Sequence, residues 1–280
     1  MNAPYAEVIG DPIAHSKSPT IHRFWLERLG VCGDYRATRV SPADLPAYIA
    51  ERRSDPDWRG ANVTMPLKEQ CLAHADEIGP CAGAIGAANV LVRRGASLVA
   101  ENTDVDGVRA ALAGRVPRQA HVVIVGAGGA ARAALFFLKQ PNVSRVAVLA
   151  RDPGRAAALR AVSPPKDGLK LQFYGFDCTA EAMSGAHIAI NASPLGSRGF
   201  SQMPPAVLRE LSHLAHDATV FDMVYTPAET ALLSFAKGLR LTAVDGLSML
   251  IGQAAAAFEI FFGKAAPHEE NEALRAVLAS

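Results

Sequence analysis

The sequence predicts an α/β protein of two domains, one of them doubly wound around a mostly parallel sheet. Short runs of β-branched and apolar residues alternate with longer stretches that have helical spacing, which is typical of α/β architecture. The apolar run HVVIV at 121–125 is followed at once by a glycine-rich turn and an apolar helical pattern. The length of 280 residues suits about two domains of roughly 150 residues each.

The first domain is predicted over residues 1–106. Strands are expected where β-branched and apolar residues gather between polar turns, at 5–10, 34–40, 60–64 and 89–94. Pro66 follows the third of these runs, and the fixed φ of proline suits the first turn of a helix. We therefore expect a helix from Pro66 through Lys68 to about Ile78.

The second domain is predicted over residues 107–245. Uninterrupted apolar runs are typical of strands buried on both faces of a parallel sheet, and such runs occur at 121–125, 145–150, 187–191, 219–224 and 239–244. The stretch 133–139 has the apolar pattern of a helix. The helices expected in 246–280 return to complete the first domain.

A phosphate-binding turn is predicted between the first strand and the first helix of the second domain. Residues 126–131 match the pattern G-x-G-x-x-A, in which the first glycine permits a tight turn and the second lets the backbone approach a pyrophosphate. Free N–H groups and the positive end of the helix dipole then hold the anion. The pattern predicts a Rossmann-type dinucleotide site, whose residues are Gly126, Ala127, Gly128, Gly129 and Ala130. The alternative is a glycine-rich turn that binds no ligand.

The residues after the second strand of this domain indicate which dinucleotide binds. NAD requires an acidic residue there, whereas the extra phosphate of NADP favours guanidinium groups. Arg151 and Arg155 favour NADP, and Asp152 between them keeps NAD open.

Composition excludes several classes of partner. The net charge is +1, which gives no basic footprint for nucleic acid or for an anionic membrane. Four scattered cysteines and eight histidines show no metal-ligand spacing, so we expect reduced thiols and no metal site. No signal-peptide pattern is present, and the apolar stretch 247–262 is too short to span a bilayer. We expect a soluble, cytoplasmic monomer or homodimer that binds a small molecule.

Polar residues in the first half carry a candidate substrate site. Ser16 and Ser18 could bind a carboxylate, although Ser18 could also be a helix N-cap. Asn62 and Thr64 lie on the same side of a predicted strand, which could also be one polar face of the sheet. Lys68 lies one turn further on and could be an ordinary surface lysine.

Asp104 ends the first half of the chain, where it passes into the nucleotide domain. Binding clefts form at such junctions. A lysine and an aspartate that face each other there can form a proton-transfer pair for the interconversion of an alcohol and a ketone.

Eight segments follow one another along nearly the whole chain: GDPIAHSKSP (10–19), GANVTMPLK (60–68), GAANVL (86–91), ENTDVDG (101–107), GAGGAAR (126–132), NASPLG (191–196), DMVY (222–225) and DGLSMLIGQAA (245–255). In these segments and in their order the chain resembles the shikimate dehydrogenase family. The resemblance implies a cytoplasmic, NADP-dependent enzyme of aromatic amino-acid biosynthesis. Such an enzyme reversibly reduces 3-dehydroshikimate to shikimate on the way to chorismate.

The resemblance also implies roles for single residues. Lys68 matches the acid/base of the family's catalytic pair, and Asp104 matches the residue that orients it and binds the substrate. The residues that match substrate contacts are Ser16, Ser18 and Tyr225 at the carboxylate and Asn62, Thr64, Asn89, Asp104 and Gln253 at the ring hydroxyls. The residues that match cofactor contacts are 126–130 at the pyrophosphate, Arg151 and Arg155 at the adenosine phosphate, and Met223 and Gly246 beside the nicotinamide.

Three departures from the family pattern leave alternatives open. Ala150-Arg151-Asp152 stands where many members have Asn-Arg-Thr, which puts strict NADP preference in question. Val90 follows Asn89 where many members have Thr. The family commonly has Gly directly after the Asp of its Asn-Thr-Asp motif, whereas Val105-Asp106 precede Gly107 here. A quinate or aminoshikimate dehydrogenase, with NAD or NADP, is one alternative. A non-catalytic nucleotide or metabolite sensor on the same fold is another.

Overall fold

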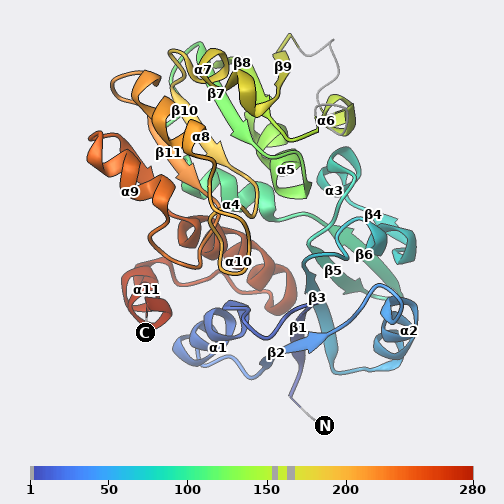
Figure 1. Cartoon of the computed structure of the whole chain (residues 1–280). Coiled ribbons are helices and arrows are strands. Elements are labelled where there is room, and N and C mark those ends of the chain that lie inside the picture. Colours follow the sequence, from blue (N-terminus) through green and yellow to red (C-terminus); the bar gives the residue numbers. More distant parts are fainter. Residues whose placement is uncertain (1–2, 153–156, 163–167, 280) are drawn as a thin grey trace. The chain divides into compact units, whose positions relative to one another are not determined.

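The computed structural model describes residues 3–152, 157–162 and 168–279. The chain divides into two compact units (Figure 1): unit 1 comprises residues 1–103 and 253–280, and unit 2 comprises residues 104–252. Among the described residues, no helix is long and apolar enough to cross a membrane.

Unit 1 is built on a mixed sheet. Its described strands are six, in the order β2-β1-β3-β5-β6-β4. Their bounds are β1 (Tyr5–Gly10), β2 (Asp34–Arg39), β3 (Trp58–Val63), β4 (Glu77–Ile78), β5 (Val90–Arg94) and β6 (Ser97–Glu101). β1 is parallel to β2 and β3, whereas β5 is antiparallel to both β3 and β6.

Helices cover both faces of this sheet. They are α1 (Ser18–Arg28), α2 (Leu45–Ser54), η1 (Gln70–His74), α3 (Pro80–Ile85), the later part of α10 (Gly246–Phe262), η5 (His268–Glu270) and α11 (Asn271–Ala279). Successive strand residues point to opposite faces, so Ile9 packs in a core with Leu45 of α2, and Val8 packs in a separate core with Phe261 of α10.

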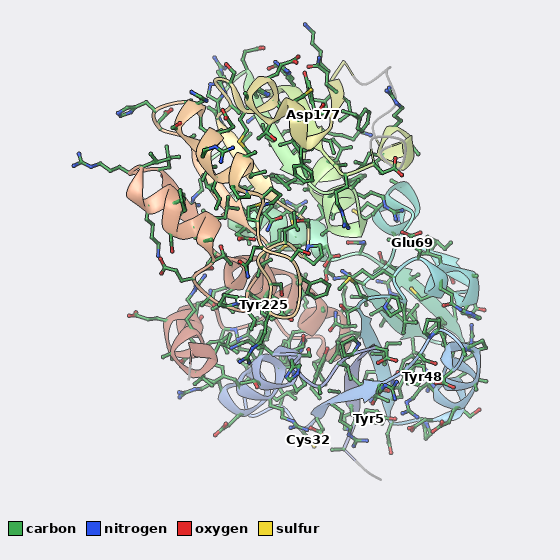
Figure 2. The ribbon with its side chains drawn as sticks, in the orientation of Figure 1. Tyr5, Cys32, Tyr48, Glu69, Asp177 and Tyr225 are labelled. Atoms are coloured by element: carbon green, nitrogen blue, oxygen red, sulfur yellow. The ribbon has the colours of Figure 1, made fainter. Side chains whose placement is uncertain are left out.

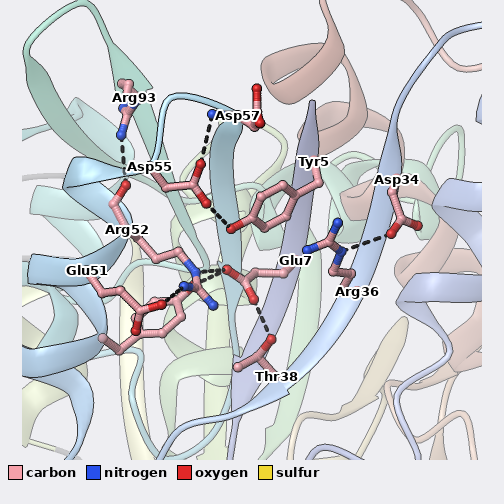
Figure 3. A network of polar contacts seen from close by, with 11 residues as sticks. Tyr5, Glu7, Asp34, Arg36, Thr38, Glu51, Arg52, Asp55, Asp57 and Arg93 are labelled. Atoms are coloured by element: carbon pink, nitrogen blue, oxygen red, sulfur yellow. Dashed lines mark hydrogen bonds and ion pairs between the residues drawn. The ribbon is translucent and has the colours of Figure 1, made fainter. Parts of the chain in front are cut away.

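A buried polar network fastens α2 to the sheet (Figure 3). The Glu7 side chain on β1 is fully buried, and its Oε1 accepts hydrogen bonds from the Tyr48 hydroxyl and from Arg52 Nε, each at 2.7 Å. The Thr38 hydroxyl on β2 donates to the other carboxylate oxygen. Strand β1 is thereby tied to both β2 and α2 by a satisfied, paired charge.

Unit 2 is a doubly wound domain. Its described strands lie in the order β12-β11-β10-β7-β8-β9 and all pair in parallel. Their bounds are β7 (Ala120–Val125), β8 (Val143–Leu149), β9 (Lys170–Tyr174), β10 (Ile188–Asn191), β11 (Thr219–Asp222) and β12 (Thr242–Val244). The order reverses between β7 and β10, and in open α/β sheets ligands bind beyond the carboxyl ends of the strands at such a reversal.

Helices lie on both faces of the second sheet as well. They are α4 (Asp104–Ala111), α5 (Gly129–Leu138), α6 (Ala157–Val162), η3 (Phe176–Cys178), α7 (Thr179–Met183), α8 (Pro205–Glu210), η4 (Leu211–His213), α9 (Ala231–Gly238) and the start of α10. Val122 and Val123 of β7 belong to different cores, one on each face. The predicted α/β fold with a Rossmann-type domain is confirmed.

The prediction of a helix from Pro66 to about Ile78 is wrong. A turn over 65–69 leads into the short 3-10 helix η1, and the chain then enters strand β4. The carbonyl of Lys68 accepts a hydrogen bond from the Ala88 backbone N–H at 2.8 Å. The Lys68 carbonyl thus accepts from a segment 20 residues further along the chain instead of from the next helical turn. The local sequence pattern does not indicate this contact.

Candidate active site

The predicted phosphate-binding turn is present in unit 2. The chain leaves β7 at Val125, turns at Gly126 with φ +112°, and enters α5 with Gly128 as N-cap. A Cβ at Gly126 would come within 3.0 Å of the Ala192 carbonyl oxygen, so both the backbone conformation and the space require glycine here.

The next two glycines have a different surrounding. A Cβ added at Gly128 or at Gly129 would meet no atom within 4 Å. The fold itself therefore does not need glycine at these positions, whereas a ligand that approaches the backbone does. With the first N–H groups of the ten-residue helix α5 directed at the same turn, the residues fit a pyrophosphate.

The residues expected to choose between NADP and NAD follow β8. Arg151 and Asp152 are both exposed, directly after the buried Ala150. Arg155 lies outside the described residues.

A buried polar hub fixes the loops that follow β10 and β11. Asp222 is fully buried and accepts hydrogen bonds from Asn191 Nδ2 at 2.9 Å, from the Val224 N–H at 3.0 Å and from the Thr230 hydroxyl at 2.6 Å. Burial raises the pKa of the Asp222 carboxyl above its usual value, although these hydrogen bonds act in the opposite direction. Asn191 and Asp222 were not among the predicted site residues, although both stand in segments that carry the family resemblance, NASPLG (191–196) and DMVY (222–225).

This hub holds the segment that carries two predicted site residues. Met223 and Tyr225 are both partly buried, and Tyr225 is labelled in Figure 2. Burial raises the pKa of the Tyr225 phenol. A Cβ at Gly246 would lie 2.5 Å from the Val224 carbonyl oxygen and 2.7 Å from that of Met223. The structure thus packs Gly246 closely against the backbone of Met223 and Val224.

A cluster of buried amides lies in unit 1, where β3 and β5 pair. Asn62, Asn89 and Gln253 are at most 9% exposed. Asn62 Nδ2 donates to the Asn89 backbone carbonyl at 3.2 Å, and Asn89 Nδ2 donates to Gln253 Oε1 at 3.3 Å. Asn89 Oδ1 accepts from the Thr103 N–H at 2.7 Å, and its Nδ2 donates to the Thr103 hydroxyl at 3.0 Å. Three predicted substrate residues are therefore in one network, to which the structure adds Thr103.

The other predicted residues of unit 1 lie on turns at the ends of its strands. Ser18 is the first residue of α1 and is buried, with Lys17 as N-cap and no side-chain cap hydrogen bond. Ser16 Oγ accepts from the Ser18 backbone N–H at 3.3 Å. The cap interpretation of Ser18 therefore does not apply. Thr64 and Lys68 are partly buried in the turn after β3.

Asp104 begins α4 in unit 2 and is 5% exposed. Acidic residues are favourable in the first turn of a helix because of the helix dipole. Among the described residues, no group of three His, Cys, Asp or Glu side chains could hold a metal ion, and the four cysteines are free thiols.

Comparisons with known proteins identify the family. Residues 8–91 match a family model described as the shikimate dehydrogenase substrate binding domain, and residues 246–277 match one described as the shikimate 5'-dehydrogenase C-terminal domain. A protein of Sphingopyxis alaskensis named shikimate dehydrogenase (NADP(+)) is 48% identical over 279 residues, covering 99% of this chain and 98% of that protein. The chain belongs to the shikimate dehydrogenase family.

Solved structures of shikimate dehydrogenase relatives share the fold. One is a shikimate dehydrogenase in complex with NADP+, with a TM-score of 0.89 and 32% identity, covering 99% of this chain and 96% of that one. Another is the quinate dehydrogenase of Corynebacterium glutamicum in complex with NAD, with a TM-score of 0.87 and 27% identity, covering 99% and 100%. The predicted resemblance is confirmed, and it assigns the chain to a family of oxidoreductases.

Proposed function

We propose that this protein reversibly reduces 3-dehydroshikimate to shikimate with NADPH, as a step toward chorismate and the aromatic amino acids. Residues 1–106 with 246–280 form the substrate domain in this proposal, and residues 107–245 form the cofactor domain. The shikimate dehydrogenase (NADP(+)) name of the 48% identical relative supports the reaction.

The amide cluster of unit 1 carries the substrate assignment. Asn62, Asn89 and Gln253 are buried amide side chains in one hydrogen-bond network, and burial of polar groups is unfavourable unless they are hydrogen-bonded. Primary amides donate and accept at once, which suits the ring hydroxyls of shikimate. Asn62 and Asn89 also lie within the segment that matches the substrate-binding family model.

Lys68 and Asp104 are proposed as the proton-transfer pair. Bound NADPH supplies the hydride that reduces the substrate carbonyl carbon. Lys68 Nζ donates a proton to the carbonyl oxygen as negative charge develops there, and it takes that proton back from the hydroxyl in the reverse reaction. Asp104 orients the Lys68 ammonium and accepts a hydrogen bond from a substrate hydroxyl. Ser16, Ser18 and Tyr225 hold the carboxylate, and Thr64 contacts the ring.

The cofactor is proposed to bind at the turn 126–130, with its nicotinamide beside Met223 and Gly246. The open space over Gly128 and Gly129 supports this. Arg151 and Arg155 are assigned to the adenosine phosphate of NADP. A G128A variant should unfold at the same denaturant concentration as the wild type but bind NADP at least about tenfold more weakly, because its Cβ enters only the space meant for the pyrophosphate.

The decisive experiment follows nicotinamide absorbance while shikimate and quinate are each combined with NADP and NAD. Fast turnover with shikimate and NADP supports the proposal. Faster turnover of quinate than of shikimate, or faster turnover with NAD than with NADP, would instead favour a quinate dehydrogenase, as the Corynebacterium glutamicum structure is named. Binding without turnover in any combination would favour the sensor alternative.

The role of Lys68 is tested in the same assay. We expect K68A to lower kcat by about 10²–10⁴-fold while KM for shikimate changes by only a few-fold. The matched control is K237A, which removes an exposed lysine paired with Glu229 and should leave both constants unchanged. A near-normal kcat in K68A contradicts the catalytic assignment.

A further inference from the structure

Tyr35 is a fully buried residue of β2 whose hydroxyl contacts one of the proposed substrate residues. Its side chain is 0% exposed, and its hydroxyl lies 2.5 Å from Asn62 Oδ1. Because water does not reach it, this hydroxyl depends on Asn62 for its hydrogen bond. The contact joins β2 to β3 across the intervening strand β1.

The orientation of the Asn62 amide follows from its two neighbours. The Asn89 backbone carbonyl can only accept a hydrogen bond, so the group 3.2 Å from it is Asn62 Nδ2. The oxygen Oδ1 therefore faces Tyr35, whose hydroxyl is the donor. Among the described residues, the contacts with Asn89 and Tyr35 use one N–H and one oxygen lone pair of the Asn62 amide. They also fix the direction of the second N–H of Asn62 Nδ2.

The ring of Tyr35 is itself held by a second buried ring. His22 of α1 is stacked on it with ring centroids 3.9 Å apart and planes 7° apart. His22 is fully buried, its ring nitrogens have no hydrogen-bond partner among the described residues, and burial lowers its pKa to about 3. It is therefore a neutral ring at physiological pH. The other aromatic rings around it are Trp25, Phe258 and Phe261.

We propose that Tyr35, with its ring held by His22, is a positioning residue that fixes the Asn62 amide for substrate recognition. The Tyr35 hydroxyl keeps Oδ1 turned inward, so that an N–H of Nδ2 is presented to a ring hydroxyl of the substrate. Without this donor the amide gains rotational freedom, and binding must then order it. The inference rests on the proposed function, in which Asn62 contacts the substrate.

The first test is Y35F, which removes the hydroxyl and keeps the ring. We expect KM for shikimate to rise about tenfold, equivalent to one lost hydrogen bond of about 1.4 kcal/mol, with kcat and KM for NADP changed by less than about threefold. The matched control is Y48F, which deletes another buried tyrosine hydroxyl of unit 1, bound to Glu7. It should reduce stability and leave KM unchanged.

A double-mutant cycle separates positioning from a general structural effect. If Tyr35 acts through Asn62, adding Y35F to N62A raises KM no further than N62A alone. A tenfold rise in both backgrounds, or no rise in Y35F, overturns the proposal.

A measurement that needs no turnover keeps this proposal distinct from the proposed function. In protein labelled with ¹⁵N at asparagine, the Asn62 side-chain amide should exchange its hydrogens at least about tenfold faster in Y35F than in the wild type, since its orientation is no longer held. Equal exchange rates overturn the positioning role. Absence of activity of the wild type on shikimate would instead contradict the proposed function. The comparison of Asn62 amide exchange rates would still test whether Tyr35 positions Asn62.

Discussion

The two units each bury a carboxylate, and they stabilise it in different ways. Glu7 of unit 1 lies in the middle of β1 and is paired with the Arg52 guanidinium as well as with two hydroxyls. Asp222 of unit 2 lies at the carboxyl end of β11 and is held by an amide, a backbone N–H and a hydroxyl, all of them neutral.

These two ways of satisfying a buried carboxylate indicate different roles for Glu7 and Asp222. A paired charge within a strand fastens a helix to a sheet, and its removal affects stability. A carboxylate satisfied by neutral donors organises the chain around it, here the end of β10 and the segment after β11 that carries Met223 and Tyr225. We therefore expect changes at Glu7 and Arg52 to affect folding alone, and changes at Asp222 to affect both folding and the proposed site.

The largest effect is expected on breaking the ion pair of unit 1. R52M leaves the Glu7 carboxylate buried without its countercharge, which should lower the free energy of unfolding by about 3–5 kcal/mol. Denaturant-induced unfolding, followed by circular dichroism, measures this loss. The activity of the molecules that remain folded should be unchanged.

Arg52 provides its own control, because it also contacts the exposed Glu51 at 2.7 Å. E51A should cost less than about 1 kcal/mol, as exposed ion pairs do. The double variant E7M/R52M should recover part of the loss seen in R52M, because it removes the unpaired charge. An R52M protein as stable as E51A would show that Glu7 does not depend on its countercharge.

A smaller loss of stability, accompanied by a loss of function, is expected at Asp222. Each of the three buried donors left without an acceptor costs about 1–3 kcal/mol, but removal of the carboxylate also relieves the unfavourable burial of that group, so we expect D222A to lose about 2–3 kcal/mol in total. Because Met223 and Tyr225 follow directly, kcat/KM for shikimate should fall in D222A by at least about tenfold more than in R52M. Equal kcat/KM values in the two folded proteins would remove the contrast between the units.

The sequence was sufficient to predict the strand, turn and helix over 120–138, because these elements follow one another along the chain without a gap. The same is true of the strands of both sheets, apart from β4, β6 and β9. The amide cluster could not be derived from spacing. Its Asn89–Gln253 contact joins residues 164 positions apart, and its Asn62–Asn89 contact depends on the antiparallel register of β3 and β5. Family resemblance named these residues, but only the fold shows that they touch.

The part played by Tyr35 was beyond sequence reasoning for the same reason. An aromatic residue in an alternating strand is ordinary core, and nothing near Tyr35 in the chain indicates Asn62. The hub of Asn191 and Asp222 differs, because both residues stand in quoted motifs. A rule that a polar residue at the end of an apolar strand needs a partner would have singled out each of them.

The smallest expected effect is a pH dependence of the stability that Asp222 contributes. The folded pKa of Asp222 is raised by burial, so its contribution to stability is complete below the unfolded pKa of about 3.9. That contribution is lost as pH rises through the folded pKa, because ionisation then costs more in the folded state than in the unfolded state.

D222N cannot ionise, and the Thr230 hydroxyl can turn to accept from its new amide. The free energy of unfolding of D222N minus that of the wild type should therefore increase from pH 4 to pH 7, as measured by urea unfolding at each pH. A difference that stays constant, or that decreases, would mean that the neutral donors around Asp222 compensate fully for its burial.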